Sequence, residues 1–75
     1  MPRRIWSNPE NPPDSVAREI SRATGRPLTR TQLGEALHVI KRIAGLRPRD
    51  QVFIFDDGSV HDAADDWIGN VYDEI

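Results

Sequence analysis

Residues 51–62, QVFIFDDGSVHD, decide the fold because two strand-forming runs flank a turn signal. Positions 52–55 hold only β-branched and aromatic residues, which favour a strand. Asp57-Gly58 suits the two central positions of a two-residue turn, since both residue types tolerate a positive φ. Residues 59–62 then return as a second strand, so the segment predicts an antiparallel hairpin.

A two-residue turn would also fix how the two strands pair. It places Phe55 opposite Val60 and Ile54 opposite His61, and residues that pair directly share a face of the sheet. One face is then expected to receive a helix through Phe53, Phe55 and Val60. The other face is expected to carry Val52, Ile54 and His61.

A first helix is predicted upstream, from residue 14 to about residue 24. Asp14 or Ser15 is expected to cap its start, because a short side-chain oxygen accepts a hydrogen bond from an unpaired backbone amide. Gly25 supplies the left-handed residue that commonly follows a helix.

A second helix follows and has stronger signals. Thr29 and Gln32 are spaced as a capping box, in which each side chain bonds the other residue's backbone amide. The apolar residues that follow recur at helical spacing and form one stripe: Leu33, Ala36, Leu37, Ile40, Ile43 and Ala44. Gly45-Leu46 predicts the helix end.

The remaining segments complete the expected architecture. Residues 67–72, WIGNVY, predict a third strand, and residues 1–13 predict an extended arm because they hold four of the six prolines. Residues 14–75 are expected to form a single α+β domain, with two N-terminal helices packed on a small three-stranded antiparallel sheet. The expected order is helix, helix, strand, strand, strand.

Charge is divided unevenly along the chain. Residues 1–49 hold all ten Arg and Lys with four acids, whereas residues 50–75 hold eight acids and no Arg or Lys. Either the basic helices pack beside an acidic sheet and the charges partly cancel, or the two poles recruit different partners. The pI near 5.5 argues against a dedicated nucleic-acid binder.

Composition excludes several classes of protein. The chain has no cysteine, which rules out disulfides and thiolate metal sites and suits the cytoplasm. No apolar run approaches the length of a membrane span, and the N-terminal segment lacks the apolar middle of a signal peptide. No phosphate-binding glycine loop, dinucleotide fingerprint or calcium loop is present, so neither a metal nor a cofactor is expected.

The titratable residues suggest one chemistry. His61 lies on the hairpin beside Asp62, which could orient it, while His38 and Lys41 are three residues apart on the second helix. A histidine and Tyr72, which could border the same face as His61, could supply the base and the acid for metal-independent phosphodiester cleavage, with a nearby Lys or Arg as the cation. His38 and His61 themselves are not expected to converge, because His38 lies far around the helix from its apolar stripe. A further set of basic residues could contact phosphates: Arg26, Arg30 and Arg42.

Residues 33–62 together with 67–74 resemble the terminal domains of bacterial polymorphic toxins, of the contact-dependent and Rhs types. The shared features are the H-x-x-K helix of His38 and Lys41, the Gly45-Leu46 stop, the strand ending in an Asp-Gly turn, and Ile68-Gly69-Asn70. Several such toxins have a ribonuclease fold of the barnase/EndoU/colicin/RelE type, with helices before a small antiparallel sheet. The resemblance implies testing His38, Lys41 and His61 for nuclease activity, with RNA as substrate and an immunity protein as partner.

Three functions are therefore compatible with the sequence. The first is a small toxin-like domain related to metal-independent ribonucleases. The second is a non-catalytic protein-interaction module that uses its charge poles or a sheet edge. The third is a regulator that binds nucleic acid through the basic helices.

Overall fold

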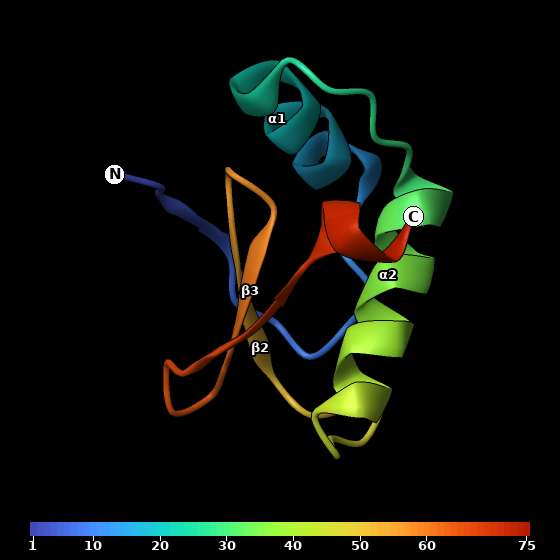
Figure 1. Cartoon of the computed structure of the whole chain (residues 1–75), viewed down its shortest axis with the longest axis vertical. Coiled ribbons are helices and arrows are strands. Elements are labelled where there is room, and N and C mark those ends of the chain that lie inside the picture. The colour runs from blue at the N-terminus through green and yellow to red at the C-terminus, as the bar shows by residue number, and fades with distance from the viewer.

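The computed structural model describes all 75 residues of the chain and shows an α+β fold. In chain order its elements are β1 (Arg4–Trp6), α1 (Asp14–Thr24), α2 (Arg30–Ile43), β2 (Val52–Phe55), β3 (Ser59–Asp62), β4 (Trp67–Asn70) and the 3-10 helix η1 (Val71–Glu74). The strands form one antiparallel sheet in the order β1-β2-β3-β4. Figure 1 shows α1 and α2 grouped beside this sheet, with η1 near both of them.

The sheet has four strands, so the prediction of three strands that all follow the helices is wrong. The additional strand, β1, comes from the residues expected to form the proline-rich arm, and it pairs with the free edge of β2. Residues 3–6 contain no proline and include Ile5 and Trp6, which suits a strand. Arg3 and Asp56 close the pairing at the turn, since the Asp56 amide donates to the Arg3 carbonyl at 2.9 Å.

The turn between β2 and β3 contains three residues and not two. The Gly58 amide donates to the Phe55 carbonyl at 3.0 Å, and Gly58 adopts a left-handed φ of +88°. This is the arrangement of a tight turn followed by one left-handed residue, which Asp-Gly supports as readily as a two-residue turn. Ile54 therefore pairs with Val60 and Phe53 pairs with His61.

This change of register reverses the predicted faces of the hairpin. The face beneath the helices is formed by the buried residues Val52, Ile54 and Val60. Phe53 and Phe55 lie on the outer face, where they are only partly buried. His61 shares the outer face with them, so it does face away from the second helix as predicted, but among different neighbours.

The second helix agrees with its capping signals, but Ile43 and Ala44 of the predicted apolar stripe are exposed. The Gln32 amide donates to Thr29 Oγ1 at 3.1 Å and the Thr29 amide donates to Gln32 Oε1 at 3.0 Å, which confirms the capping box. At the other end Gly45 has a φ of +76°, and the Leu46 amide donates to the Lys41 carbonyl at 2.8 Å. The predicted stop at Gly45-Leu46 is therefore confirmed.

The first helix ends as predicted but begins differently. Gly25 is left-handed, with a φ of +71°, and its amide bonds to the Ser21 carbonyl. Pro13 occupies the N-cap position, and no side chain caps this end, so neither Asp14 nor Ser15 acts as the cap. Proline has no backbone N–H, so a proline directly before a helix leaves one amide fewer without a partner, and no side-chain hydrogen bond is needed for it.

The core lies between the helices and the inner face of the sheet. Its buried apolar residues come from every layer: Val16, Ala17, Ile20, Leu28, Leu33, Ala36, Leu37, Ile40, Val52, Ile54, Val60, Val71 and Tyr72. Gly69 lets α2 approach β4 closely, because a Cβ there would lie 3.2 Å from the Ile40 side chain. None of the helices combines the length and apolar character needed to cross a membrane.

The predicted third strand is shorter than expected. It ends at Asn70, whose side-chain oxygen accepts a hydrogen bond from the Tyr72 amide at 2.9 Å and so starts η1. Tyr72 is consequently in a 3-10 helix that turns its side chain into the core, and its predicted place in the third strand is wrong.

Candidate functional site

One hollow on the surface contains two of the predicted site residues. His38 and Lys41 lie one turn apart on α2, and the residues that line the hollow with them are Pro9, Glu10, Asn11, Gly34, Leu37, Pro48 and Arg49. Residues three apart on a helix project from the same side, so both side chains reach the same space. The opposite wall comes from the segment between β1 and α1 and from the loop between α2 and β2.

Lys41 has an unusual position for a lysine. Its residue is only 8% exposed, and its Nζ donates to the Pro48 carbonyl at 2.7 Å. No carboxylate lies within ion-pair distance of it. Burial lowers the pKa of Lys41 from its ordinary value, and the negative charge of Asp50 partly opposes this shift.

The hollow is suited to an anion. Lys41 and Arg49 bring two cations to its wall, while Glu10 brings one carboxylate. An ammonium has three hydrogens to donate, and only one hydrogen bond is made by Lys41 within the chain. His38 is exposed and lines the same hollow, where its ring nitrogens can take part in hydrogen bonds.

A second hollow adjoins the first along α2. Its lining shares Asn11 and Gly34 with the first hollow and extends it toward Arg30 at the start of the helix. Gly34 has nothing within 4 Å of the position of a Cβ, so the groove is open at this point. An extended ligand could therefore continue from the Lys41 end of α2 toward its N-terminus.

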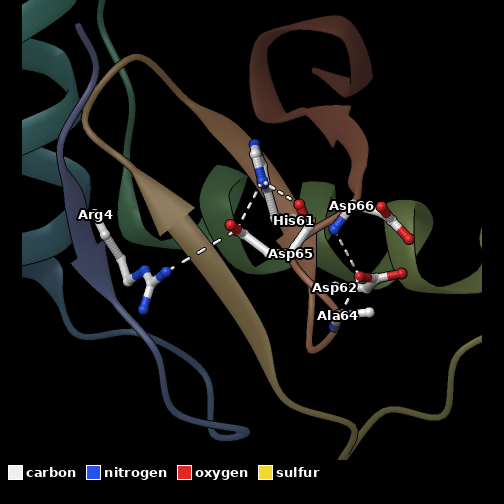
Figure 2. Close-up of polar contacts among 6 residues, drawn as sticks. All are labelled: Arg4, His61, Asp62, Ala64, Asp65 and Asp66. Atoms are coloured by element: carbon white, nitrogen blue, oxygen red, sulfur yellow. Dashed lines mark hydrogen bonds and ion pairs between the residues drawn. The ribbon is translucent and has the colours of Figure 1, made fainter.

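His61 is on a different surface. It lies on β3 at the outer face of the sheet, and its ring centroid is 4.4 Å from that of Phe55. Figure 2 shows Arg4, His61 and Asp65 in front of the sheet, with α2 behind it. The sheet and the helix layer separate His61 from the hollow that contains His38, so the two histidines cannot act on the same bond.

The carboxylate that contacts His61 belongs to Asp65 and not to Asp62. His61 Nδ1 lies 3.1 Å from Asp65 Oδ1 and 3.1 Å from the Asp65 carbonyl (Figure 2). Asp62 instead organises the loop between β3 and β4, because its Oδ1 accepts hydrogen bonds from the amides of Ala64 and Asp66. The expected orienting role of Asp62 is therefore wrong, and the loop brings in Asp65 for that position.

Tyr72 and Arg26 have a structural role. The buried Tyr72 hydroxyl lies 2.8 Å from Thr24 Oγ1 and donates to the Arg26 carbonyl at 2.9 Å. The Arg26 guanidinium stacks over the Tyr72 ring, with its central carbon 4.1 Å from the ring centroid. These contacts join η1 to the end of α1, and they place both residues away from the hollow.

The three arginines predicted to bind phosphate do not converge. Arg30 and Arg42 are twelve residues apart on α2, which corresponds to about 18 Å along the helix axis. Arg26 lies in the loop before the helix and stacks on Tyr72. The arginine that does line the hollow with Lys41 is Arg49.

Comparisons with protein-family models, curated proteins and solved structures return no match. Sequence reasoning missed Arg49, Pro48 and Glu10, which come from loops whose positions depend on the folded chain. The only signal in the sequence was the basic stretch at residues 47–49 directly after the second helix.

Proposed function

We propose that the chain is a small toxin-like ribonuclease domain and that its reaction centre is the hollow formed around His38 and Lys41. The observation that supports this most directly is that an imidazole, a buried ammonium and a guanidinium line one hollow. These groups are the base and the cations that RNA cleavage without a metal requires. His61 and Tyr72 are not part of the proposed centre.

The proposed reaction assigns one step to each group. His38 removes the proton from a ribose 2′-hydroxyl, whose oxygen then attacks the adjacent phosphorus. Arg49 and Lys41 stabilise the added negative charge on the phosphate oxygens. The bond to the 5′-oxygen breaks, and that oxygen takes a proton from the Lys41 ammonium, which burial makes a stronger acid. The products are a 2′,3′-cyclic phosphate and a free 5′-hydroxyl.

The two histidines provide a matched test of this proposal. RNA cleavage should persist in EDTA, and His38→Ala should lower the rate by about 100-fold or more, which is the usual contribution of a general base. His61→Ala removes the same side chain from the other side of the sheet and should leave the rate within about twofold of the wild type. Loss of activity in His61→Ala with retention in His38→Ala would reject the assignment, and so would the absence of any RNA cleavage.

A second function is favoured by a separate surface. The outer face of the sheet carries partly exposed aromatic side chains and no covering element, as expected for a protein-interaction module. A nucleic-acid-binding regulator is the third candidate, and it would bind RNA through the groove on α2 without cutting it. Binding that weakens steeply with salt while the RNA stays intact would favour that candidate.

A further inference from the structure

A row of side chains crosses the outer face of the sheet from one edge to the other. Arg4 on β1 pairs with Phe55 on β2, Phe53 pairs with His61 on β3, and His61 pairs with Trp67 on β4. Residues that pair directly share a face, so Arg4, Phe53, Phe55 and His61 lie on the outside. The register shifts between Val60 and His61 where β3 meets β4, and Trp67 is 61% exposed at this edge of the sheet. This face is separate from the hollow on α2, so a ligand can bind here whether or not the hollow is catalytic.

Arg4 shows how this face holds a guanidinium. The central carbon of its guanidinium lies 4.0 Å from the centroid of the Phe53 ring, and one terminal nitrogen lies 4.0 Å from Asp65 Oδ1. Figure 2 shows Arg4 and Asp65 reaching toward each other across the sheet. A ring beneath the cation and a carboxylate beside it are the two groups that bind a guanidinium well.

The β4 edge of this face has an exposed ring with no cation on it, directly after an acidic loop. Trp67 is 61% exposed, and no arginine or lysine stacks on it within the chain. Indole is the ring that binds cations most strongly. The adjacent loop carries Asp66, whose side chain takes part in no ion pair.

Most acidic side chains in the second half of the chain take part in no ion pair. Of the eight acidic side chains in residues 50–75, only that of Asp65 takes part in an ion pair. The pair of Arg4 and Asp65 is the one ion pair that joins the basic first half of the chain to the acidic second half. Asp62, Asp65 and Asp66 lie at the end of β3 and in the loop before Trp67. This group of acids favours a cationic partner and opposes the phosphates of a nucleic acid.

We propose that the outer face of the sheet binds an arginine-rich segment of a partner protein, with a partner arginine stacked on Trp67 beside Asp66. Arginine fits better than lysine because its planar guanidinium can lie flat on a ring while it donates to a carboxylate. Arg4 occupies the equivalent place on Phe53 and fixes one end of the row. The open Trp67 end provides the contact for the partner.

The test uses the whole chain and two synthetic peptides, one of alternating Arg and Ser and its counterpart of alternating Lys and Ser. Calorimetric titration should show tighter binding of the Arg peptide. Trp67→Ala should weaken it about tenfold, in line with a stacked cation at a partly dry site. Ile43→Ala, which removes an exposed apolar side chain from α2, should leave the affinity unchanged.

A second pair of variants separates a specific site from general charge attraction. Asp66→Asn should weaken binding of the Arg peptide several-fold, whereas Glu35→Gln removes one charge from the helix side and should have no effect. Equal affinity for both peptides, or an affinity that neither Trp67→Ala nor Asp66→Asn changes, would overturn the proposal. Binding of single-stranded RNA, or self-association of the chain, that Trp67→Ala abolishes would overturn it as well.

Discussion

Gly58 lies against Asn70 so closely that a Cβ on the glycine would come within 2.9 Å of the Asn70 side-chain oxygen. The same two segments are joined by hydrogen bonds, since Asn70 Nδ2 donates to the Asp57 carbonyl and the Val71 amide donates to the Gly58 carbonyl. The turn of the hairpin is therefore locked to the start of η1. This contact helps to hold the C-terminal segment against the rest of the fold.

Gly58→Ala should destabilise the protein by about 2–3 kcal/mol. The left-handed φ of +88° is unfavourable for alanine, and the new methyl group would also collide with Asn70 and the Val71 side chain. Gly45→Ala is the matched control, because Gly45 also has a positive φ but has open space around it. Gly45→Ala should lower the free energy of unfolding by only about 1–2 kcal/mol, because only the backbone conformation is unfavourable there. Urea unfolding of both variants checks the difference, and equal losses would show that the contact with Asn70 is unimportant.

Tyr72→Phe should lower the free energy of unfolding by about 1–2 kcal/mol. The change removes the hydroxyl that contacts Thr24 Oγ1 and the Arg26 carbonyl while keeping the ring in the core. Any RNA cleavage by the chain should continue at the wild-type rate, because Tyr72 does not line the hollow of His38. A large loss of cleavage in a stable Tyr72→Phe variant would make this tyrosine a catalytic candidate again.

The fold was partly predictable because its local signals are strong. The capping box of Thr29 and Gln32 and the stop at Gly45 depend on residues within one helix, so they could be recognised in the sequence. The hairpin was predictable as an element, but its register was not. Asp-Gly occurs in two-residue and three-residue turns, and one extra residue moves every following side chain to the other face.

The candidate site was less predictable than the fold. The spacing of His38 and Lys41 on one helix was sufficient to place them together. The partners Pro48 and Arg49 lie in a loop whose position is set by tertiary packing, and β1 required a free strand edge that local patterns do not reveal. His61 was correctly expected on the face away from the second helix, and for that reason it cannot join His38.

Substitutions at Gly34 can change the shape of the hollow without changing the charges that line it. Gly34→Ala should stabilise the protein by about 0.5–1 kcal/mol, because glycine is unfavourable inside a helix and a methyl group meets no neighbour here. Gly34→Met should also fold, but its longer side chain would extend into the groove and reduce RNA cleavage. Cleavage rates and thermal unfolding of the two variants check this. Equal rates in both would show that RNA does not occupy this part of the groove.

Lys41 should make the stability of the protein depend on pH in the alkaline range. Its pKa is lowered from 10.5 by burial, so between the lowered value and 10.5 the unfolded chain binds more protons than the folded chain. Charged Lys41 therefore lowers the free energy of unfolding at neutral pH. This loss disappears as the pH rises through the window. Lys41→Met removes the ammonium and should be at least as stable as the wild type at pH 7, with the advantage shrinking as the pH approaches 10.5. Urea unfolding of both proteins across this range measures the difference.

Arg42→Met is the control, because it removes an exposed and permanently charged neighbour. Its free energy of unfolding should differ from that of the wild type by the same amount at every pH in this range. A difference for Lys41→Met that is equally constant would mean that Lys41 is as well solvated in the folded protein as in the unfolded chain.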